Sequence, residues 1–218
     1  MSVEIKEKIE KLKEKIRKHD YFYYVLSQPS IADKEYDDLI RQLIELENKY
    51  PQYRAEDSPS QRLSSGISEG FKTVKHSAGM FSLDNTYSVE ELKLWDERVR
   101  KGLGKDAVYE YMAELKFDGV SVNLTYVKGK FIVGATRGDG ACGEDVTANI
   151  KTIRAIPLAL LGKDLADFME IRGEAYMDKK DFLNVNQERL EQGEVLFANP
   201  RNATSGSLKL LDSNLVAK

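Results

Sequence analysis

The sequence has almost no cysteine and no long apolar run. Cys142 is the single cysteine among 218 residues, so neither an internal disulfide nor a cysteine-built zinc site can form within them. No apolar stretch reaches the roughly 18 residues that a membrane-spanning helix needs. The first residues, MSVEIKEKIEKLKEKIRK, lack the apolar centre of a signal peptide. We therefore expect a protein of the reducing cytoplasm that contacts no membrane.

A surplus of basic residues is also missing. Lys and Arg number 33 against 36 Asp and Glu, which gives a net charge of -3. A protein that grips DNA by itself usually carries a basic surplus, because its affinity comes largely from neutralised phosphates. The overall charge therefore argues against independent DNA binding, although a local basic patch stays possible. With 41% hydrophobic and 32% charged residues, the composition is typical of a globular protein with a core.

The first 75 residues predict two helices and a linker. Apolar residues at helical spacing indicate one helix over 3–19 and a second over about 34–50, with Asp33 as its N-terminal cap and Pro51 after its end. The segment DSPSQRLSSGISEG that follows is rich in Ser, Pro and Gly, which is typical of a linker. We expect a helical subdomain at 1–56, a linker at 57–75 and a second domain at 76–218.

The second domain is expected to mix helices and strands. Ser88, with Glu91 three residues later, predicts a capped helix over about 88–101. Alternating apolar residues then indicate strands, two of them joined as a hairpin through Lys128-Gly129. The expected strands are 109–117, 120–127, 130–136 and 168–176, and further helices are expected near 144–155 and 178–191. The fold class is therefore α+β, with a small helical N-terminal subdomain before a mostly antiparallel sheet.

Three charged residues are expected on one face of the strand 109–117 and its end. Strand alternation places Glu114, Lys116 and Asp118 together, and turns Leu115 and Phe117 toward a core. Such charges on a buried strand are costly unless they pair or serve chemistry, so they fit either a structural ion-pair cluster or a lysine nucleophile. Neighbouring carboxylates alone keep a lysine protonated, so the two acids would orient groups, bind ribose or hold metal.

Residues 116–119, Lys-Phe-Asp-Gly, match the Lys-x-Asp-Gly hallmark of the covalent nucleotidyltransferases. Four residues alone are weak evidence, and the blocks around them decide the family. Those blocks follow one another along nearly the whole sequence in the order found in NAD-dependent DNA ligases, which they resemble. They are Ser82-Leu83-Asp84-Asn85, Arg137-Gly138-Asp139-Gly140, Gly143-Glu144-Asp145-Val146-Thr147, Glu170-Ile171-Arg172-Gly173-Glu174 and Phe197-Ala198-Asn199-Pro200-Arg201-Asn202.

The resemblance implies that Lys116 attacks the α-phosphorus of NAD, forms a phosphoamide with AMP and releases nicotinamide mononucleotide (NMN). It also implies that Glu114 and the Ser82-Leu83 backbone hold the adenosine, and that Asp118 positions ribose or a divalent metal. Three further cofactor contacts are implied at Arg137, Glu174 and, for phosphate, Arg201. Alternation along 168–176 puts Glu174 on one face with Glu170 and Arg172, from which it can reach the same cleft.

The first fifty residues favour NAD over ATP, which the Lys-x-Asp-Gly motif cannot do. They resemble the NMN-binding pattern of the bacterial enzymes, with aromatic rings to stack on nicotinamide and carboxylates to attract its positive ring and bind ribose. The residues implied are Tyr23, Tyr24, Asp33, Lys34, Glu35, Tyr36 and Asp37. Tyr24 stands where some members have His. Taken without the other blocks, these tyrosines would be interpreted first as packing a helical hairpin; together with those blocks they favour NAD.

The resemblance further implies a fragment of a larger, monomeric enzyme. The truncated core is of the nucleotidyltransferase (ATP-grasp-like ligase adenylation) type, and the later lysine motifs and DNA-binding modules of the family would follow residue 218. The complete enzyme would seal nicked double-stranded DNA in replication and repair, using NAD with Mg²⁺ or Mn²⁺. Zinc is expected only in the following region. Lys209 stands where many relatives have Arg.

Two alternatives remain open at this point. One is an ATP-dependent nucleotidyltransferase, and the other is a non-catalytic NAD-binding module that keeps the fold without the chemistry. A third possibility is rejected: residues 138–143 match G-x-G-x-x-G, but Asp139 would sit among the phosphate-binding amides and no βαβ pattern surrounds them. His19 and His76 are interpreted as surface or structural residues rather than ligands.

Overall fold

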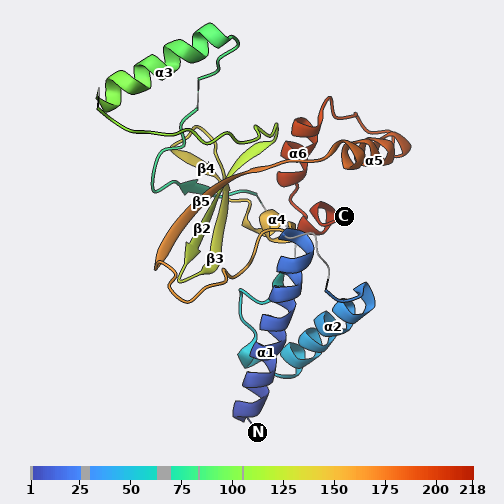
Figure 1. Ribbon diagram of the computed structural model, residues 1–218. Coiled ribbons are helices and arrows are strands. Elements are labelled where there is room, and N and C mark those ends of the chain that lie inside the picture. The colour runs from blue at the N-terminus through green and yellow to red at the C-terminus, as the bar shows by residue number, and fades with distance from the viewer. Residues whose placement is uncertain (1, 26–29, 63–69, 83, 105) are drawn as a thin grey trace.

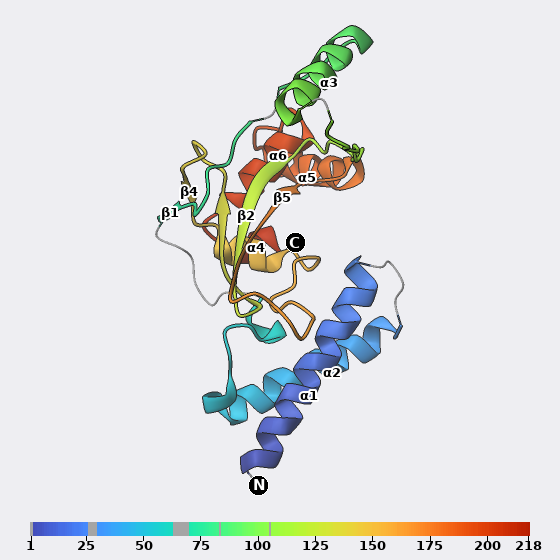
Figure 2. The ribbon, with the colours of Figure 1, turned by 60° about the vertical axis from the view of Figure 1, so that its left-hand side comes forward.

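The computed structural model describes residues 2–25, 30–62, 70–82, 84–104 and 106–218. It confirms an α+β fold. Two N-terminal helices, α1 and α2, lie together at one end of the molecule and helix α3 lies at the other, with the antiparallel sheet between them (Figures 1 and 2). Within the described residues, no helix is both long and apolar enough to cross a membrane.

The N-terminal helices form a unit with a core of its own. Helix α1 (Ser2–Asp20) continues as one turn of π-helix (Tyr21–Val25), and α2 spans Asp33–Lys49. Their apolar faces meet at Ile9, Leu12, Ile16 and Leu43, which are all buried. Both helices were predicted from their apolar spacing. The prediction of Asp33 as cap is wrong, because α2 begins at Asp33 and Ala32 is the capping residue, whose N–H donates to Glu35 at 3.2 Å.

A buried ion pair ties the next segment to this helical unit. Lys13 and Glu47 are each 1% exposed, with Lys13 Nζ 3.7 Å from Glu47 Oε1. The same carboxylate accepts hydrogen bonds from the hydroxyls of Ser58, at 2.7 Å, and Ser60. Because a buried carboxylate needs several partners, these serines fix the short 3₁₀ turn η3 (Pro59–Gln61) against α2. A similar 3₁₀ turn, η2 (Pro51–Tyr53), directly follows α2.

The centre of the second part is a three-stranded antiparallel sheet in the order β3-β2-β5. Its strands are β2 (Val120–Val127), β3 (Lys130–Thr136) and β5 (Phe168–Ala175), close to the predicted ranges. The β2–β3 hairpin turns at Lys128 and Gly129, whose φ angles of 49° and 74° indicate a type I′ turn. The core under the sheet contains Val122, Leu124, Tyr126, Phe131, Val146, Ile150, Leu158 and Leu208.

Smaller elements surround this sheet. Strands β1 (Thr73–Lys75) and β4 (Cys142–Glu144) pair as a second antiparallel sheet. Helix α4 (Thr147–Thr152) is shorter than the helix predicted over 144–155, and α5 spans Lys179–Glu191. Two short helices, α6 (Pro200–Leu208) and α7 (Ser213–Val216), follow. They bring the C-terminal residues back to α4, because Asn149 Nδ2 donates to the carbonyls of Leu208 and Leu210 at 2.8 Å each.

Helix α3 (Val89–Leu103) projects away from the sheet (Figure 1). Its predicted cap is confirmed, since the Ser88 hydroxyl accepts from the Glu91 N–H at 3.1 Å. An extended segment beginning near Tyr109 returns along it, and the hydroxyls of Tyr109 and Tyr111 donate to Asp96 at 3.0 and 2.9 Å. Desolvation together with the Asp96 hydrogen bond raises the pKa of Tyr111 to about 12. These tyrosines hold α3 to the segment that leads to Lys116.

Polar contacts join the helical unit to the sheet domain. The Arg62 guanidinium donates to Asp20 at the end of α1 and to three carbonyls at the end of α4 and just after it. Asp57 pairs with both Arg17, at 2.8 Å, and Lys130, at 3.3 Å. Burial opposes ionisation of Asp57, but these two cations outweigh it and lower the pKa of the carboxyl. A cavity of about 610 Å³, largely apolar, lies beside these contacts.

Candidate active site

The segment that carries Glu114, Lys116 and Asp118 is not a strand. Residues 110–118 have no regular secondary structure, so the strand predicted over 109–117 is wrong. The prediction that Leu115 and Phe117 face a core is also wrong, since they are 82% and 44% exposed. A strand needs ladder partners, and this segment pairs with no other part of the described chain. Phe117 does stack on Tyr176, with ring centroids 4.6 Å apart, which holds the end of the segment beside β5.

Glu174 holds the start of β2 directly after Asp118. Its carboxylate accepts from the Gly119 N–H at 3.2 Å and from the Ser121 hydroxyl at 2.7 Å. Ser121 and Glu174 are paired residues in the β2–β5 register, which puts both side chains on one face. A Cβ at Gly119 would lie 2.1 Å from the Ala175 carbonyl oxygen, so the glycine is required by the approach of β5 itself. The structure therefore brings Glu174 to the Lys-x-Asp-Gly motif.

Arg201 reaches the same motif from another element. Its guanidinium lies 3.3 Å from Asp118 Oδ1, and both side chains are exposed. Arg201 is in the first turn of α6, which Asn199 caps by accepting from the Asn202 N–H at 2.8 Å. A guanidinium suits an anion. Beside the Lys-x-Asp-Gly motif, the arrangement therefore offers one exposed cation, Arg201, in addition to Lys116.

Arg137 and Ser82 are in contact at 3.3 Å, guanidinium to hydroxyl. The turn that carries Arg137 is closed by Asp139, whose carboxylate accepts from the N–H groups of Ala141 and Cys142 at 2.9 and 2.8 Å. These two bonds lower the pKa of Asp139. Since Asp139 occupies those amides and a strand rather than a helix follows, this glycine-rich turn is no dinucleotide-binding loop.

His76 is a residue of this site that the sequence analysis did not use. It is 5% exposed, so it is a structural residue and not a surface one. Its Nε2 lies 3.1 Å from the Arg137 carbonyl oxygen, and its Nδ1 lies 3.3 Å from Asn123 Nδ2. Its backbone N–H donates to the Ala141 carbonyl at 3.0 Å. Its position six residues before Ser82 was the only sequence signal.

The face of β5 holds the segment between His76 and Ser82. Glu170 accepts from the Ser77 N–H at 3.1 Å, and the Arg172 guanidinium donates to the Ala78 carbonyl at 2.7 Å. Burial opposes ionisation of Glu170, but its hydrogen bonds from Ser77 lead the effects that lower its pKa. Glu170 and Arg172 were predicted to share one face of β5 with Glu174. On that face, Glu170 and Arg172 contact the segment that ends in Ser82.

For some of the other predicted residues, the structure gives little or no information on the side chain. Leu83 and the side chains of Tyr24 and Asp33 lie outside the described part of the chain. Lys209 pairs with Glu144 at 2.5 Å. Across the ranges given above, no three His, Cys, Asp or Glu side chains are gathered as a metal site.

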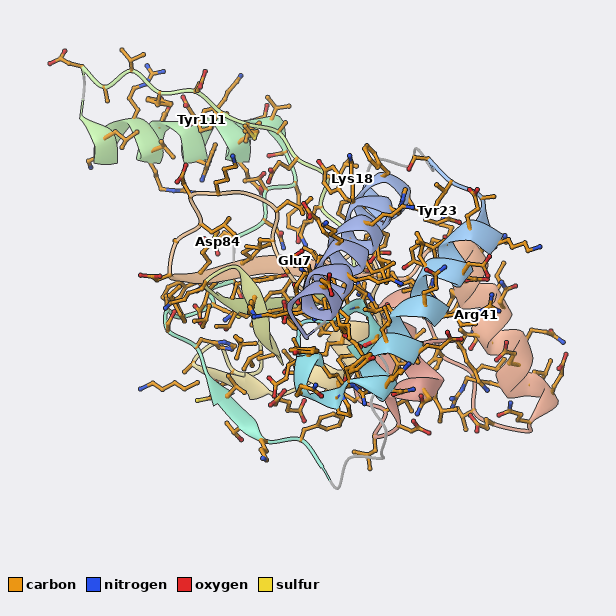
Figure 3. The ribbon with its side chains drawn as sticks, turned by 90° about the horizontal axis from the view of Figure 1, so that it is seen from below. Glu7, Lys18, Tyr23, Arg41, Asp84 and Tyr111 are labelled. Atoms are coloured by element: carbon orange, nitrogen blue, oxygen red, sulfur yellow. The ribbon has the colours of Figure 1, made fainter. Side chains whose placement is uncertain are left out.

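The N-terminal residues predicted to read the cofactor lie on the helical unit, apart from Lys116. Tyr23, Lys34 and Asp37 are exposed, and the Tyr36 hydroxyl donates to Asp20 at 2.6 Å. Figure 3 shows Tyr23 beside the α1–α2 pair and Tyr111, in the segment that leads to Lys116, at the opposite side of the molecule. In this structure Tyr23 and the start of the segment that leads to Lys116 therefore lie on different sides of the molecule.

Comparison with known proteins agrees with both parts of the fold. Residues 2–64 match the model of the DNA ligase-like N-terminal NAD+-binding domain, and residues 68–218 match that of the NAD-dependent DNA ligase adenylation domain. The chain is 54% identical to the DNA ligases of Thermotoga petrophila and Petrotoga mobilis, each over 98% of its length, and 48% identical to that of Coprothermobacter proteolyticus over 99%. It spans 30%, 31% and 32% of these relatives, respectively. Through both of its domains, the chain belongs to the NAD-dependent DNA ligase family.

Proposed function

We propose that this chain is the part of a DNA ligase that reads NAD and accepts AMP, with Lys116 as the nucleophile. The contacts of Asp118–Ser121 support the proposal, because they bring Glu174 from β5 and Arg201 from α6 to the end of the Lys-x-Asp-Gly motif. Ser82 and Arg137, in mutual contact, would hold the adenosine and phosphate side of NAD. Glu114 would contact the adenosine, and Asp118 the ribose or a metal-bound phosphate.

The proposed reaction is a displacement at the α-phosphorus of NAD. The Lys116 ammonium first loses a proton to solvent, and its lone pair then forms the P–N bond while the nitrogen loses a second proton, also to solvent. The bond from the α-phosphorus to the bridging oxygen breaks, and NMN leaves with that electron pair as its phosphate. Arg201 and Arg137 are the side chains suited to stabilise charge on the phosphates. A Mg²⁺ or Mn²⁺ ion would neutralise phosphate charge, held mainly by the substrate.

On the helical unit, we propose that Tyr23, Tyr24, Tyr36 and the carboxylates of Asp33 and Asp37 bind the NMN half of NAD, with Lys34 and Glu35 beside them. The match of residues 2–64 to an NAD+-binding domain supports this role. Because Tyr23 and the start of the segment that leads to Lys116 lie on different sides of the molecule, the helical unit would have to close over bound NAD. The complete enzyme, a cytoplasmic monomer, would pass AMP to the 5′-phosphate of nicked DNA in replication and repair.

The decisive experiment is incubation with NAD or ATP and Mg²⁺, followed by intact-mass measurement. We expect slow, incomplete gain of one AMP from NAD and none from ATP, because the later family motifs are not among these 218 residues. Lys116→Arg should abolish the gain, whereas Lys163→Arg, an exposed control, should not. Rapid stoichiometric AMP transfer would contradict the expected impairment. Transfer from ATP but not NAD in a chain extended by those motifs would overturn the cofactor assignment.

A further inference from the structure

A continuous chain of polar contacts runs from Tyr36 to the sheet domain. The Tyr36 hydroxyl donates to Asp20 Oδ1 at 2.6 Å, and Arg62 Nη2 donates to Asp20 Oδ2 at 3.4 Å. Each oxygen of one carboxylate thus serves a different partner. Tyr36 belongs to α2 in the helical unit, whereas Arg62 directly follows the 3₁₀ turn η3 in the segment that connects the two parts.

Arg62 is anchored firmly on the sheet-domain side. Its Nη1 lies 3.1, 3.4 and 3.3 Å from the carbonyl oxygens of Lys151, Ile153 and Ile156. These carbonyls belong to the last turn of α4 and the residues after it, where helix carbonyls lack partners within the helix. The guanidinium therefore satisfies the end of α4 and holds Asp20 with its other nitrogen. Only 13% of the Arg62 side chain is exposed.

The burial of Asp20 is unfavourable for a carboxylate. Asp20 is the last residue of α1 before the π-helical turn, and its side chain is only 8% exposed. Because a buried carboxylate costs free energy unless it is paired, Asp20 depends on Tyr36 and Arg62 together.

The joint at which these contacts lie is loosely packed. The cavity of about 610 Å³ is lined by Asp20 at the end of α1, by Tyr21 after it, by Arg62, and by Leu158 and Met169 from the sheet domain. Since apolar packing is interrupted there, polar contacts carry much of the attachment between the two parts.

We propose that Asp20 is a positioning residue that couples NMN binding at Tyr36 to docking of the helical unit, through Arg62. The inference rests on the proposed function, which places the NMN half of NAD on Tyr36. A ligand that takes the Tyr36 hydroxyl as its partner removes one of the two supports of Asp20. Docking on Arg62 then weakens, and the helical unit is released to close over the adenylation site. Linkage makes this coupling reciprocal. If bound NMN weakens docking on Arg62, then loss of docking strengthens NMN binding.

The first test measures NMN affinity calorimetrically with the full 218-residue chain. Arg62→Gln should bind NMN about fivefold or more tightly than the unchanged chain, although Arg62 is no proposed ligand contact. Asp20→Asn, which keeps an oxygen for Tyr36 but loses the charge, should do the same. Tyr36→Phe should weaken NMN binding and cancel the effect of Arg62→Gln in the double variant. Arg41→Gln, which removes an exposed arginine paired with Asp38 on α2, is the matched control and should change nothing.

The second test measures docking directly. Spin labels at Glu45→Cys on α2 and Lys163→Cys in the sheet domain, in a Cys142→Ser background, report the distance between the two parts. NMN should shift that distance in the otherwise unchanged chain, and Arg62→Gln should shift it without NMN. NMN binding of equal affinity in the chain and in Arg62→Gln would overturn the coupling and leave the proposed function standing. Absence of NMN binding in every variant would overturn the proposed function itself.

Discussion

At the scale of single residues, His76 connects a buried amide to the backbone of the Arg137 turn. The imidazole accepts from Asn123 on one nitrogen, so its other nitrogen carries the proton that Arg137 O accepts. Asn123 is 2% exposed, so water cannot readily replace the bond from its amide nitrogen to His76. Its Oδ1 has no hydrogen-bond partner among the described residues. His76 thereby sets where Arg137 and Ser82 stand relative to each other.

Replacing His76 by Ala should destabilise the sheet domain by about 1–3 kcal/mol, because it leaves a buried amide and a carbonyl unsatisfied. Urea denaturation measures the loss, and hydrogen exchange should show faster exchange in residues 137–142. His19→Ala is the control, since the His19 ring hydrogen-bonds to the exposed Ser30 hydroxyl and lies on α1, outside the sheet domain. An unchanged denaturation midpoint in His76→Ala would show that the contacts of His76 with Asn123 and Arg137 do not stabilise the fold.

At this scale, the sequence predicts well the features that depend on a single helix or strand, such as the face on which a side chain lies. Glu174 was expected to reach the Lys116 region because strand alternation fixes its face, and the register with Ser121 brings it there. The contact of Arg201 with Asp118 joins residues 83 positions apart, and the contact of His76 with Arg137 joins residues 61 positions apart. Spacing along the chain carries no information on such contacts, because they depend on how separate elements pack.

At the scale of elements, the β2–β3 hairpin follows directly from its turn. Both Lys128 and Gly129 have positive φ, the backbone that a two-residue type I′ turn requires and that glycine adopts without strain. Gly129 is also closely covered, since a Cβ there would lie 2.5 Å from Leu165 Cδ1.

Gly129→Ala should therefore lower the free energy of unfolding by about 1–2 kcal/mol, the usual penalty of a left-handed alanine, with a further loss from the Leu165 contact. Gly102→Ala is the matched control. It lies in α3 with open space around its Cβ position, and should stabilise by about 0.4–1 kcal/mol. Thermal unfolding of the two variants should thus shift in opposite directions; a shift in the same direction would refute the turn assignment.

The same elements show where sequence patterns fail. The helices over 3–19 and 34–50 and the hairpin were predictable because their signals are local: apolar spacing, and a glycine in a two-residue turn. The strand expected over 109–117 has equally good alternation, yet most of its residues lie exposed and none forms a strand pair with another part of the described chain. Alternation states which faces a strand would have, but a strand forms only where a neighbouring backbone satisfies its hydrogen bonds. The predicted N-terminal cap of α2 is wrong by one residue, because the Ala32 carbonyl accepts from the Glu35 and Tyr36 N–H groups and the Ala32 N–H donates to the Glu35 side chain.

At the scale of the whole molecule, the two parts have separate cores joined by a polar interface. One cluster, around Ile9 and Leu43, lies between α1 and α2, and the other, around Val122 and Ile150, lies under the sheet. Arg62 and Lys130 span the joint. A chain built this way can lose one part while the other stays folded.

We expect hydrogen exchange monitored by mass spectrometry in increasing urea to show two transitions. Leu43→Ala should destabilise the helical unit by about 2–5 kcal/mol and leave the sheet nearly unchanged, because the cavity it creates lies in one core only. Ile150→Ala should have the converse effect. If both variants lowered the protection of both parts equally, the molecule would be a single cooperative unit.

The uncovered segment that leads to Lys116 has one more consequence, for how the protein behaves in solution. Val108, Met112 and Leu115 are 100%, 85% and 82% exposed, along a backbone whose N–H and C=O groups have no ladder. Such a stretch is a template on which a second extended chain can pair. Self-association of this chain should therefore begin there as protein concentration rises, and it would block Lys116 first.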